Sequence, residues 1–88
     1  MWVEVTQEDI EAGESGECTE CPVALALSRA GFLPAVMQTK TNFFSADGEV
    51  VSDDWSHPVN VSRFIVDFDA RRPVKPIKFN VPKRFLHA

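Results

Sequence analysis

The sequence of this 88-residue chain lacks most features that mark specialised classes of protein. It contains two cysteines, which are too few for the disulfide scaffold of a small secreted domain. No apolar run approaches the roughly 18 residues that a membrane span needs. The first ten residues lack the basic and apolar stretches of a signal peptide. We therefore expect a soluble protein of the cytoplasm that does not contact membranes.

The residue patterns of common enzymes are also missing. No serine stands in the setting of a nucleophile elbow, no glycine-rich loop could hold a phosphate, and tyrosine is absent. The histidines are His57 and His87, and His57 directly precedes Pro58, which is more typical of a turn or a helix cap than of a catalytic base. The sequence therefore predicts no cofactor and no enzymatic activity.

Length and composition are those of one small globular domain. Hydrophobic residues make up 44% of the chain and charged residues 25%, which is ordinary for a folded protein. We expect a single domain over residues 1–88, with residues 83–88 as a possible tail. The net charge of −4 argues against a dedicated nucleic-acid-binding protein, because such proteins usually carry a basic excess.

The charges are distributed unevenly along the chain. Residues 1–20 contain seven acidic residues and no basic one, whereas residues 71–88 contain six basic residues and no acidic one. Facing charges of opposite sign stabilise paired strands modestly. We therefore expect either that the two ends lie side by side and neutralise each other, or that one of them forms a binding surface.

Hydrophobic periodicity and turn residues predict seven elements in the order β-α-α-β-β-α-β. We expect strands at 2–6, 35–44, 49–51 and 77–81, a short helix at 7–12, and longer helices at 22–30 and 58–70. Residues 52–56 are predicted to form a loop. The fold class is α+β: a small two-layer sandwich in which two main helices cover one face of a mostly antiparallel sheet of three or four strands.

Particular residues support the ends of these elements. Thr6 followed by Asp9 resembles a capping box, which would begin the first helix. Ser56 or His57 is expected to cap the last helix. Two prolines bracket the strand at 77–81 and restrict it to a sheet edge. An exposed edge there could pair with a second copy, so we expect a monomer or a homodimer.

The pair Cys18-x-x-Cys21 is the one motif with intrinsic chemistry. It precedes a helix, where the helix dipole stabilises a thiolate, as in thioredoxin-like redox motifs. Glu17 and Glu20 flank the cysteines and oppose such activation, because negative charge raises a thiol pKa. A zinc site needs four ligands, so two cysteines are only weak candidates for metal binding. We favour structural packing of the thiols, with a thiol–disulfide redox protein or a zinc-stabilised module as alternatives.

Binding to another protein is the function that the remaining residues favour. Trp55 stands in a polar stretch with Asp53 and Asp54, where it is either an interface residue or a cover for the core. The glutamate-rich segment 7–20 could occupy a basic groove of a partner. The candidate contact residues are Trp55, Asp53, Asp54, Glu8, Glu11, Glu14 and Glu17. Lysine, arginine and phenylalanine interleave over 75–85, so a nucleic-acid-binding module is a further alternative.

Several short motifs occur together between positions 3 and 81. The residues concerned are Thr6, Ile10, Gly13, Cys21 to Ala26, Phe64, Ile65, Phe68, Asp69, Pro73, Val74, Pro76 and Phe79. In this combination the chain resembles a family of short hypothetical proteins of phage, prophage and bacterial genomes. The family pattern has a Cys-Pro-[Ile/Val]-Ala-Leu-Ala helix and a later Phe-Ile-x-x-Phe-Asp…Pro-Val-x-Pro segment. The resemblance implies a phage-type accessory protein that binds a host or viral protein in the host cytoplasm, and it carries over no site residues.

Overall fold

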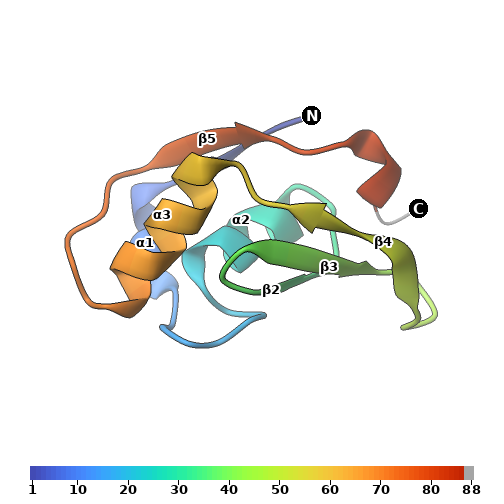
Figure 1. Ribbon diagram of the computed structural model, residues 1–88, viewed down its shortest axis with the longest axis horizontal. Helices are drawn as coiled ribbons and strands as arrows, with labels where there is room; N and C mark the ends of the chain where they lie inside the picture. Colours follow the sequence, from blue (N-terminus) through green and yellow to red (C-terminus); the bar gives the residue numbers. More distant parts are fainter. Residues whose placement is uncertain (87–88) are drawn as a thin grey trace.

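The computed structural model describes residues 1–86, apart from the side chain of Ser52. The elements are β1 (Trp2–Val5), α1 (Gln7–Ala12), α2 (Pro22–Arg29), β2 (Pro34–Val36), β3 (Lys40–Phe44), β4 (Val50–Ser56), α3 (Val59–Asp69), β5 (Ile77–Asn80) and a 3-10 turn (Lys83–Phe85). β2, β3 and β4 form an antiparallel sheet, and β1 pairs with β5 in a second antiparallel sheet (Figure 1). The α+β class is confirmed, with the strands divided between two sheets.

Helix α2 connects the two sheets, because it packs against both β1 and β2. Its residues Val23, Ala24 and Leu27 are buried, as the run of apolar residues predicts. The small side chain of Ala24 permits close approach of neighbouring elements. Gly31 follows the helix with a φ of 103°, a left-handed conformation that glycine adopts without steric cost. The helix α1 packs against α2, and α3 packs against β5.

The two ends of the chain lie side by side, as the charge distribution predicts. β1 and β5 run antiparallel with Glu4 opposite Lys78. The amino group of Met1 donates hydrogen bonds to the side chain of Asn80 (2.6 Å) and to the carbonyl of Val81 (2.9 Å). Glu4 and Lys78 face each other without a direct ion pair, because in residues 1–86 no salt bridge joins the acidic end to the basic end.

The single strand predicted at 35–44 is divided into β2 and β3. The chain reverses at positions 37–39, where the N–H of Met37 donates to the carbonyl of Lys40 at 2.8 Å. Methionine, glutamine and threonine occupy these positions, and none of them is a usual turn former. The reversal therefore had no local signal in the sequence.

The loop predicted at 52–56 is wrong, because these residues continue strand β4. Trp55 lies opposite Thr41, and Asp54 lies opposite Asn42. The pairing between β3 and β4 shifts register before Asp54, which indicates a β-bulge. A bulge interrupts the two-residue alternation, so the strand pattern is hidden in the sequence.

The helix caps agree with prediction at α1 and differ at α3. The hydroxyl of Thr6 accepts a hydrogen bond from the N–H of Asp9 (3.2 Å), and the Asp9 carboxylate accepts one from the N–H of Thr6 (2.9 Å). This reciprocal arrangement confirms the capping box. The cap expected from Ser56 or His57 is wrong, because α3 begins after Pro58 without a side-chain cap.

A chain of aromatic side chains joins the two sheets in the core. The rings of Phe43 and Phe85 stack with centroids 4.6 Å apart, and Phe32 lies 5.4 Å from Phe43. Trp55 lies 6.5 Å from Phe43 and 5.6 Å from Phe79. Because Trp55 belongs to β4 and Phe79 to β5, their contact connects the three-stranded sheet to the two-stranded sheet. Such pairs contribute roughly 0.5–1.5 kcal/mol beyond the burial of their area.

The C-terminal segment predicted as a possible tail packs onto the core as far as Leu86. Lys83–Phe85 form a 3-10 turn, and the exposed fraction of Phe85 is 1%. The remaining two residues, His87 and Ala88, lie outside the described part of the chain.

Replacement of Phe85 by alanine tests whether this segment is part of the core. We expect the free energy of unfolding to fall by about 3 kcal/mol, since a large buried aromatic side chain is lost. The matched control is Lys83→Ala in the same turn, where the side chain is exposed and the change should be small. Denaturant unfolding followed by fluorescence measures both. Equal effects of the two substitutions would show that the segment does not pack as described.

Candidate interaction face

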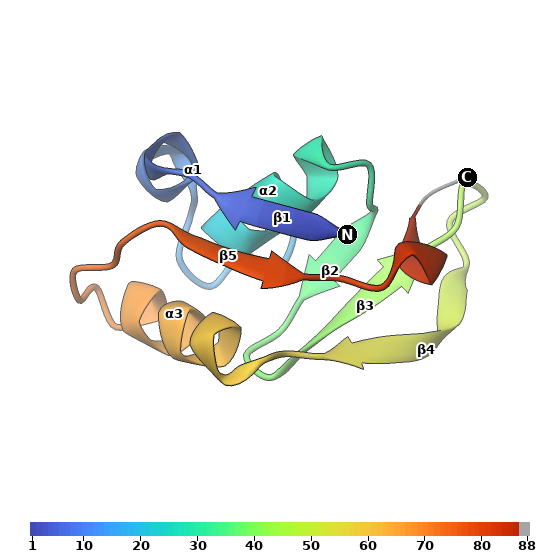
Figure 2. The same ribbon diagram turned by 90° about the horizontal axis from the view of Figure 1, so that it is seen from above.

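The outer face of β1 and β5 carries four exposed side chains, which we call the Trp2 face: Trp2, Glu4, Lys78 and Asn80. Val3 and Val5 point into the core, and strand alternation therefore directs Trp2 and Glu4 outward. The exposed fraction of Trp2 is 70%. Figure 2 looks onto these two strands, with α1 continuing from the end of β1. An open hollow of about 560 Å³ lies beside Trp2 and is also lined by Glu4 and Lys78.

Side chains from two helices bind the outer carbonyls of this small sheet. The guanidinium of Arg29 donates to the carbonyl of Glu4 (3.0 Å), and the amide of Asn60 donates to the carbonyl of Lys78 (3.0 Å). Both carbonyls point away from the partner strand, so Glu4 and Lys78 form a non-hydrogen-bonded pair, the type in which side chains lie closest. The edge at 77–81, predicted to be exposed, is therefore occupied at Lys78. Arg29 and Asn60 thus bind the edges of the two-stranded sheet, whereas its outer face is exposed to solvent.

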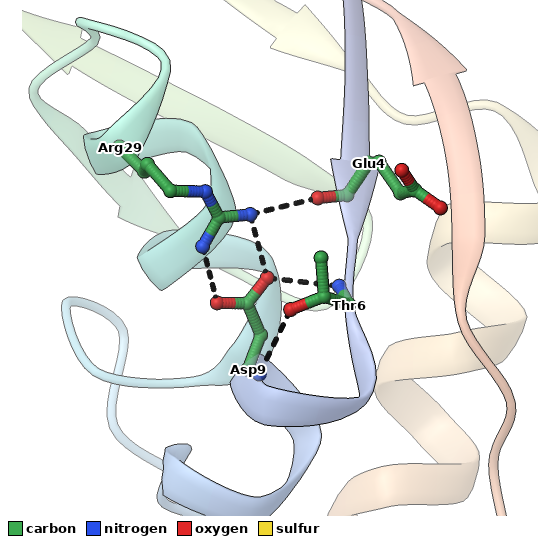
Figure 3. A network of polar contacts seen from close by, with 4 residues as sticks. All are labelled: Glu4, Thr6, Asp9 and Arg29. Atoms are coloured by element: carbon green, nitrogen blue, oxygen red, sulfur yellow. Dashed lines mark hydrogen bonds and ion pairs between the residues drawn. The ribbon is translucent and has the colours of Figure 1, made fainter.

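Asp9 and Arg29 form the ion pair that positions β1, α1 and α2 (Figure 3). The two guanidinium nitrogens lie 2.6 and 2.8 Å from the two carboxylate oxygens, which is a bidentate geometry. The exposed fraction of Asp9 is only 5%. Burial on its own would raise the pKa of Asp9, but hydrogen bonds from Arg29 and Thr6 outweigh it and hold the pKa below its ordinary value.

Residues 7–20 form a second exposed feature, which we call the acidic segment. Its glutamates are all exposed: Glu8, Glu11, Glu14, Glu17 and Glu20. None of them takes part in a salt bridge with another described residue. The segment is held in place by hydrogen bonds from the N–H of Glu14 to the carbonyl of Glu20 (2.8 Å) and from Gly16 N–H to the carboxylate of Asp69 (3.2 Å). The predicted contacts Glu8, Glu11, Glu14 and Glu17 are therefore all exposed, although Asp9 between them is buried.

The other predicted contact group does not form a site. Of the two alternatives for Trp55, the structure supports the cover for the core and not the interface residue, because its exposed fraction is 8% and its ring belongs to the core. Asp53 and Asp54 are exposed, but Asp53 pairs with Arg84 and Asp54 pairs with Lys40 (3.2 Å). Adjacent strand residues point to opposite faces, so the two carboxylates do not converge.

Sequence reasoning missed Trp2, although the signal was present. The alternation Trp2-Val3-Glu4-Val5 places two valines on one face and therefore predicts a tryptophan on the other.

The basic end of the chain does not form the interleaved site of a nucleic-acid-binding protein. Phe79 and Phe85 are buried, so neither ring is available to stack on a base. Arg84 pairs with Asp53, and Arg72 pairs with Asp67 at 3.0 Å.

The two cysteines differ in environment. Cys18 is exposed, whereas Cys21 is buried at the start of α2, and both are free thiols. Burial raises the pKa of Cys21, and the carboxylate of Asp69 adds to this effect. No group of three or more histidine, cysteine, aspartate or glutamate side chains in residues 1–86 is arranged to hold a metal ion.

His57 is half-buried between β4 and α3, and the residue at the N-cap of α3 is Pro58. Its Nε2 is 2.6 Å from the hydroxyl of Thr41, and its ring meets Trp55 edge-on at 5.2 Å. Burial lowers the pKa of His57. Because Thr41 is fully buried, the pair is a structural contact and not an accessible nucleophile with its base.

Comparisons of the chain with protein-family models, with curated proteins and with solved structures find no match. Among the described residues, no helix has the length and apolar character needed to cross a membrane.

Substitution of Asp9 by asparagine tests the ion pair of Figure 3. We expect a loss of about 2 kcal/mol in the free energy of unfolding, because a buried, bidentate partner of Arg29 is removed. The matched control is Asp53→Asn, which breaks an exposed pair and should cost less than about 1 kcal/mol.

The stability difference between wild type and Asp9→Asn should decrease as the pH falls. The pKa of Asp9 is lower in the folded state than the ordinary value of 3.8. The ionised carboxylate therefore stabilises the fold fully above pH 3.8, and this contribution is lost as the pH falls through the lower folded-state pKa. Urea unfolding of wild type and of Asp9→Asn between neutral and acidic pH measures this contribution to the free energy of unfolding. A difference between wild type and Asp9→Asn that stays constant down to the most acidic pH would contradict the account.

Proposed function

We propose that this chain is a non-enzymatic accessory protein that binds another protein through the Trp2 face, assisted by the acidic segment. The observation that carries the proposal is a 70% exposed tryptophan on a strand whose inner residues are in the core. The backbone of this strand is fixed by pairing with β5 and by the hydrogen bond from Arg29. A rigid aromatic side chain loses little conformational entropy on binding, and tryptophan is enriched among the residues that dominate interface energies.

Charge complementarity indicates the kind of partner. The first basic residue of the chain is Arg29, and its guanidinium is already engaged by Asp9. The glutamates of the acidic segment are exposed and take part in no salt bridge with other residues in 1–86. We therefore expect a protein surface that is basic and contains an apolar recess for the indole ring. Complementary charge would raise the association rate, and the indole would slow dissociation.

The resemblance to short phage and prophage proteins extends this proposal to the origin of the partner. A chain of that kind would bind a host or viral protein in the cytoplasm of the host cell. Acidic surfaces can occupy grooves that otherwise accept nucleic acid, because both present negative charge to basic residues. The acidic segment supports such a role.

A synthetic amphipathic helix with leucine on one face and lysine on the other is a direct probe. Trp2 is exposed and Trp55 is buried, so a blue shift in tryptophan emission on titration reports desolvation of Trp2. Isothermal titration calorimetry compares the affinities of all variants, because Trp2→Ala lacks the reporting indole. We expect this substitution to weaken binding by about thirtyfold, equivalent to about 2 kcal/mol. Replacement of Glu8, Glu11, Glu14 and Glu17 by glutamine should slow association and flatten its dependence on salt.

Two controls make the test specific. The peptide with glutamate in place of lysine should not bind. Val59→Ala removes another exposed apolar side chain, at the start of α3, and should leave the affinity unchanged. Absence of binding, or binding that Trp2→Ala does not weaken, would contradict the proposal.

A further inference from the structure

Cys18 and Cys21 lie in one helical turn that precedes α2. The carbonyl of Glu17 accepts hydrogen bonds from the N–H groups of Glu20 (3.2 Å) and Cys21 (2.9 Å), which closes the turn over 17–21. Side chains three residues apart in such a turn are neighbours, with Cβ atoms about 5–6 Å apart. A disulfide needs a Cβ separation of about 4 Å, so a small rotation within the turn would bring the sulfur atoms together.

The surroundings of the two thiols make one accessible and the other sheltered. Both cysteines line a hollow of about 170 Å³, whose other walls include Val36 and Ile65. Cys18 is exposed, whereas Cys21 has an exposed fraction of 6%. The carbonyl of Cys18 accepts a hydrogen bond from the N–H of Val36 (2.7 Å), which ties the turn to β2. An exposed thiol beside a buried one is the arrangement in which a first cysteine reacts and a second resolves the product.

The geometry points to a dithiol modification site, in which Cys18 and Cys21 form a reversible intramolecular disulfide by exchange with a small-molecule disulfide such as oxidised glutathione. The Cys18 thiolate attacks one sulfur of glutathione disulfide, forms a mixed disulfide and releases one glutathione thiolate. The Cys21 thiolate then attacks the sulfur of Cys18 and releases the second glutathione. The two protein thiols are oxidised and glutathione disulfide is reduced to two thiols, which take up the two protons that Cys18 and Cys21 lose.

The charged groups around the hollow determine the rate of these steps. Glu17 and Asp69 line it, and no lysine or arginine does. Carboxylates disfavour a thiolate, and burial raises the pKa of Cys21 further. The second step is therefore slow at neutral pH and faster in alkali, as suits a stoichiometric modification and not a turnover enzyme. This site is independent of Trp2 and of the proposed binding function.

The test uses the reduced, full-length protein in buffers of graded glutathione to glutathione disulfide ratio. After alkylation of free thiols, mass spectrometry distinguishes the internal disulfide, which lacks two hydrogen atoms, from a glutathione adduct. We expect wild type to pass to the internal disulfide and to return to the dithiol when reduced glutathione is added. Cys21→Ser should stop at a persistent adduct on Cys18. Cys18→Ser should remain unmodified, because its remaining thiol is buried.

Two results would overturn the inference. One is a wild-type protein that keeps the glutathione adduct on Cys18 as Cys21→Ser does. The other is a disulfide that joins two chains. Because Cys21 is part of the core, its variant could lose its fold, and the wild-type mass spectrum with peptide mapping then decides by itself.

Discussion

Arg29, at the end of α2, contacts the buried carboxylate of Asp9 in α1 and the carbonyl of Glu4 in β1 with a single guanidinium group. The Asp9 carboxylate also completes the capping box, because it accepts a hydrogen bond from the N–H of Thr6. The same carboxylate therefore caps the start of α1 and links α1 to α2 through Arg29. Loss of either partner leaves a charge without its counterpart, which is costly when the remaining charge is buried. The first thirty residues depend on this ion pair for their arrangement.

The consequences extend from this pair across the molecule. Once β1 is fixed against α2, it pairs with β5, and Phe79 of β5 reaches Trp55 in the other sheet. Trp2 points outward on the same strand because Val3 and Val5 occupy the core. The following segment is also confined, because Gly13 approaches Pro22 so closely that a Cβ atom would lie 2.5 Å from the proline Cδ. The close approach of Gly13 to Pro22 thus fixes the path of the acidic segment between α1 and α2.

The features that could be predicted from the sequence are those with a clear signal in residue type, spacing or charge. The capping box at Thr6, the buried helix from Pro22 and the proximity of the chain ends were all predictable, because each follows from composition within a few residues or from net charge. The division of 35–44 into two strands was not, since its turn lacks turn residues. The burial of Trp55 depends on pairing with Thr41 of β3, next to a bulge that hides the strand pattern, so the sequence left an interface position and a core position as alternatives. Trp2 was predictable from alternation, whereas the Arg29 contact, twenty residues from Asp9, was not.

Amide hydrogen exchange in an Arg29→Gln protein tests the central role of this pair most directly. The exchanging groups include the N–H of Ile10 and Gly13 in and after α1, both hydrogen-bonded to carbonyls of that region. Relative to wild type, the account predicts loss of protection at these amides and in β1, while β3 and β4 keep theirs apart from any global loss of stability. A uniform loss of protection over the chain, or no change in α1, would contradict it.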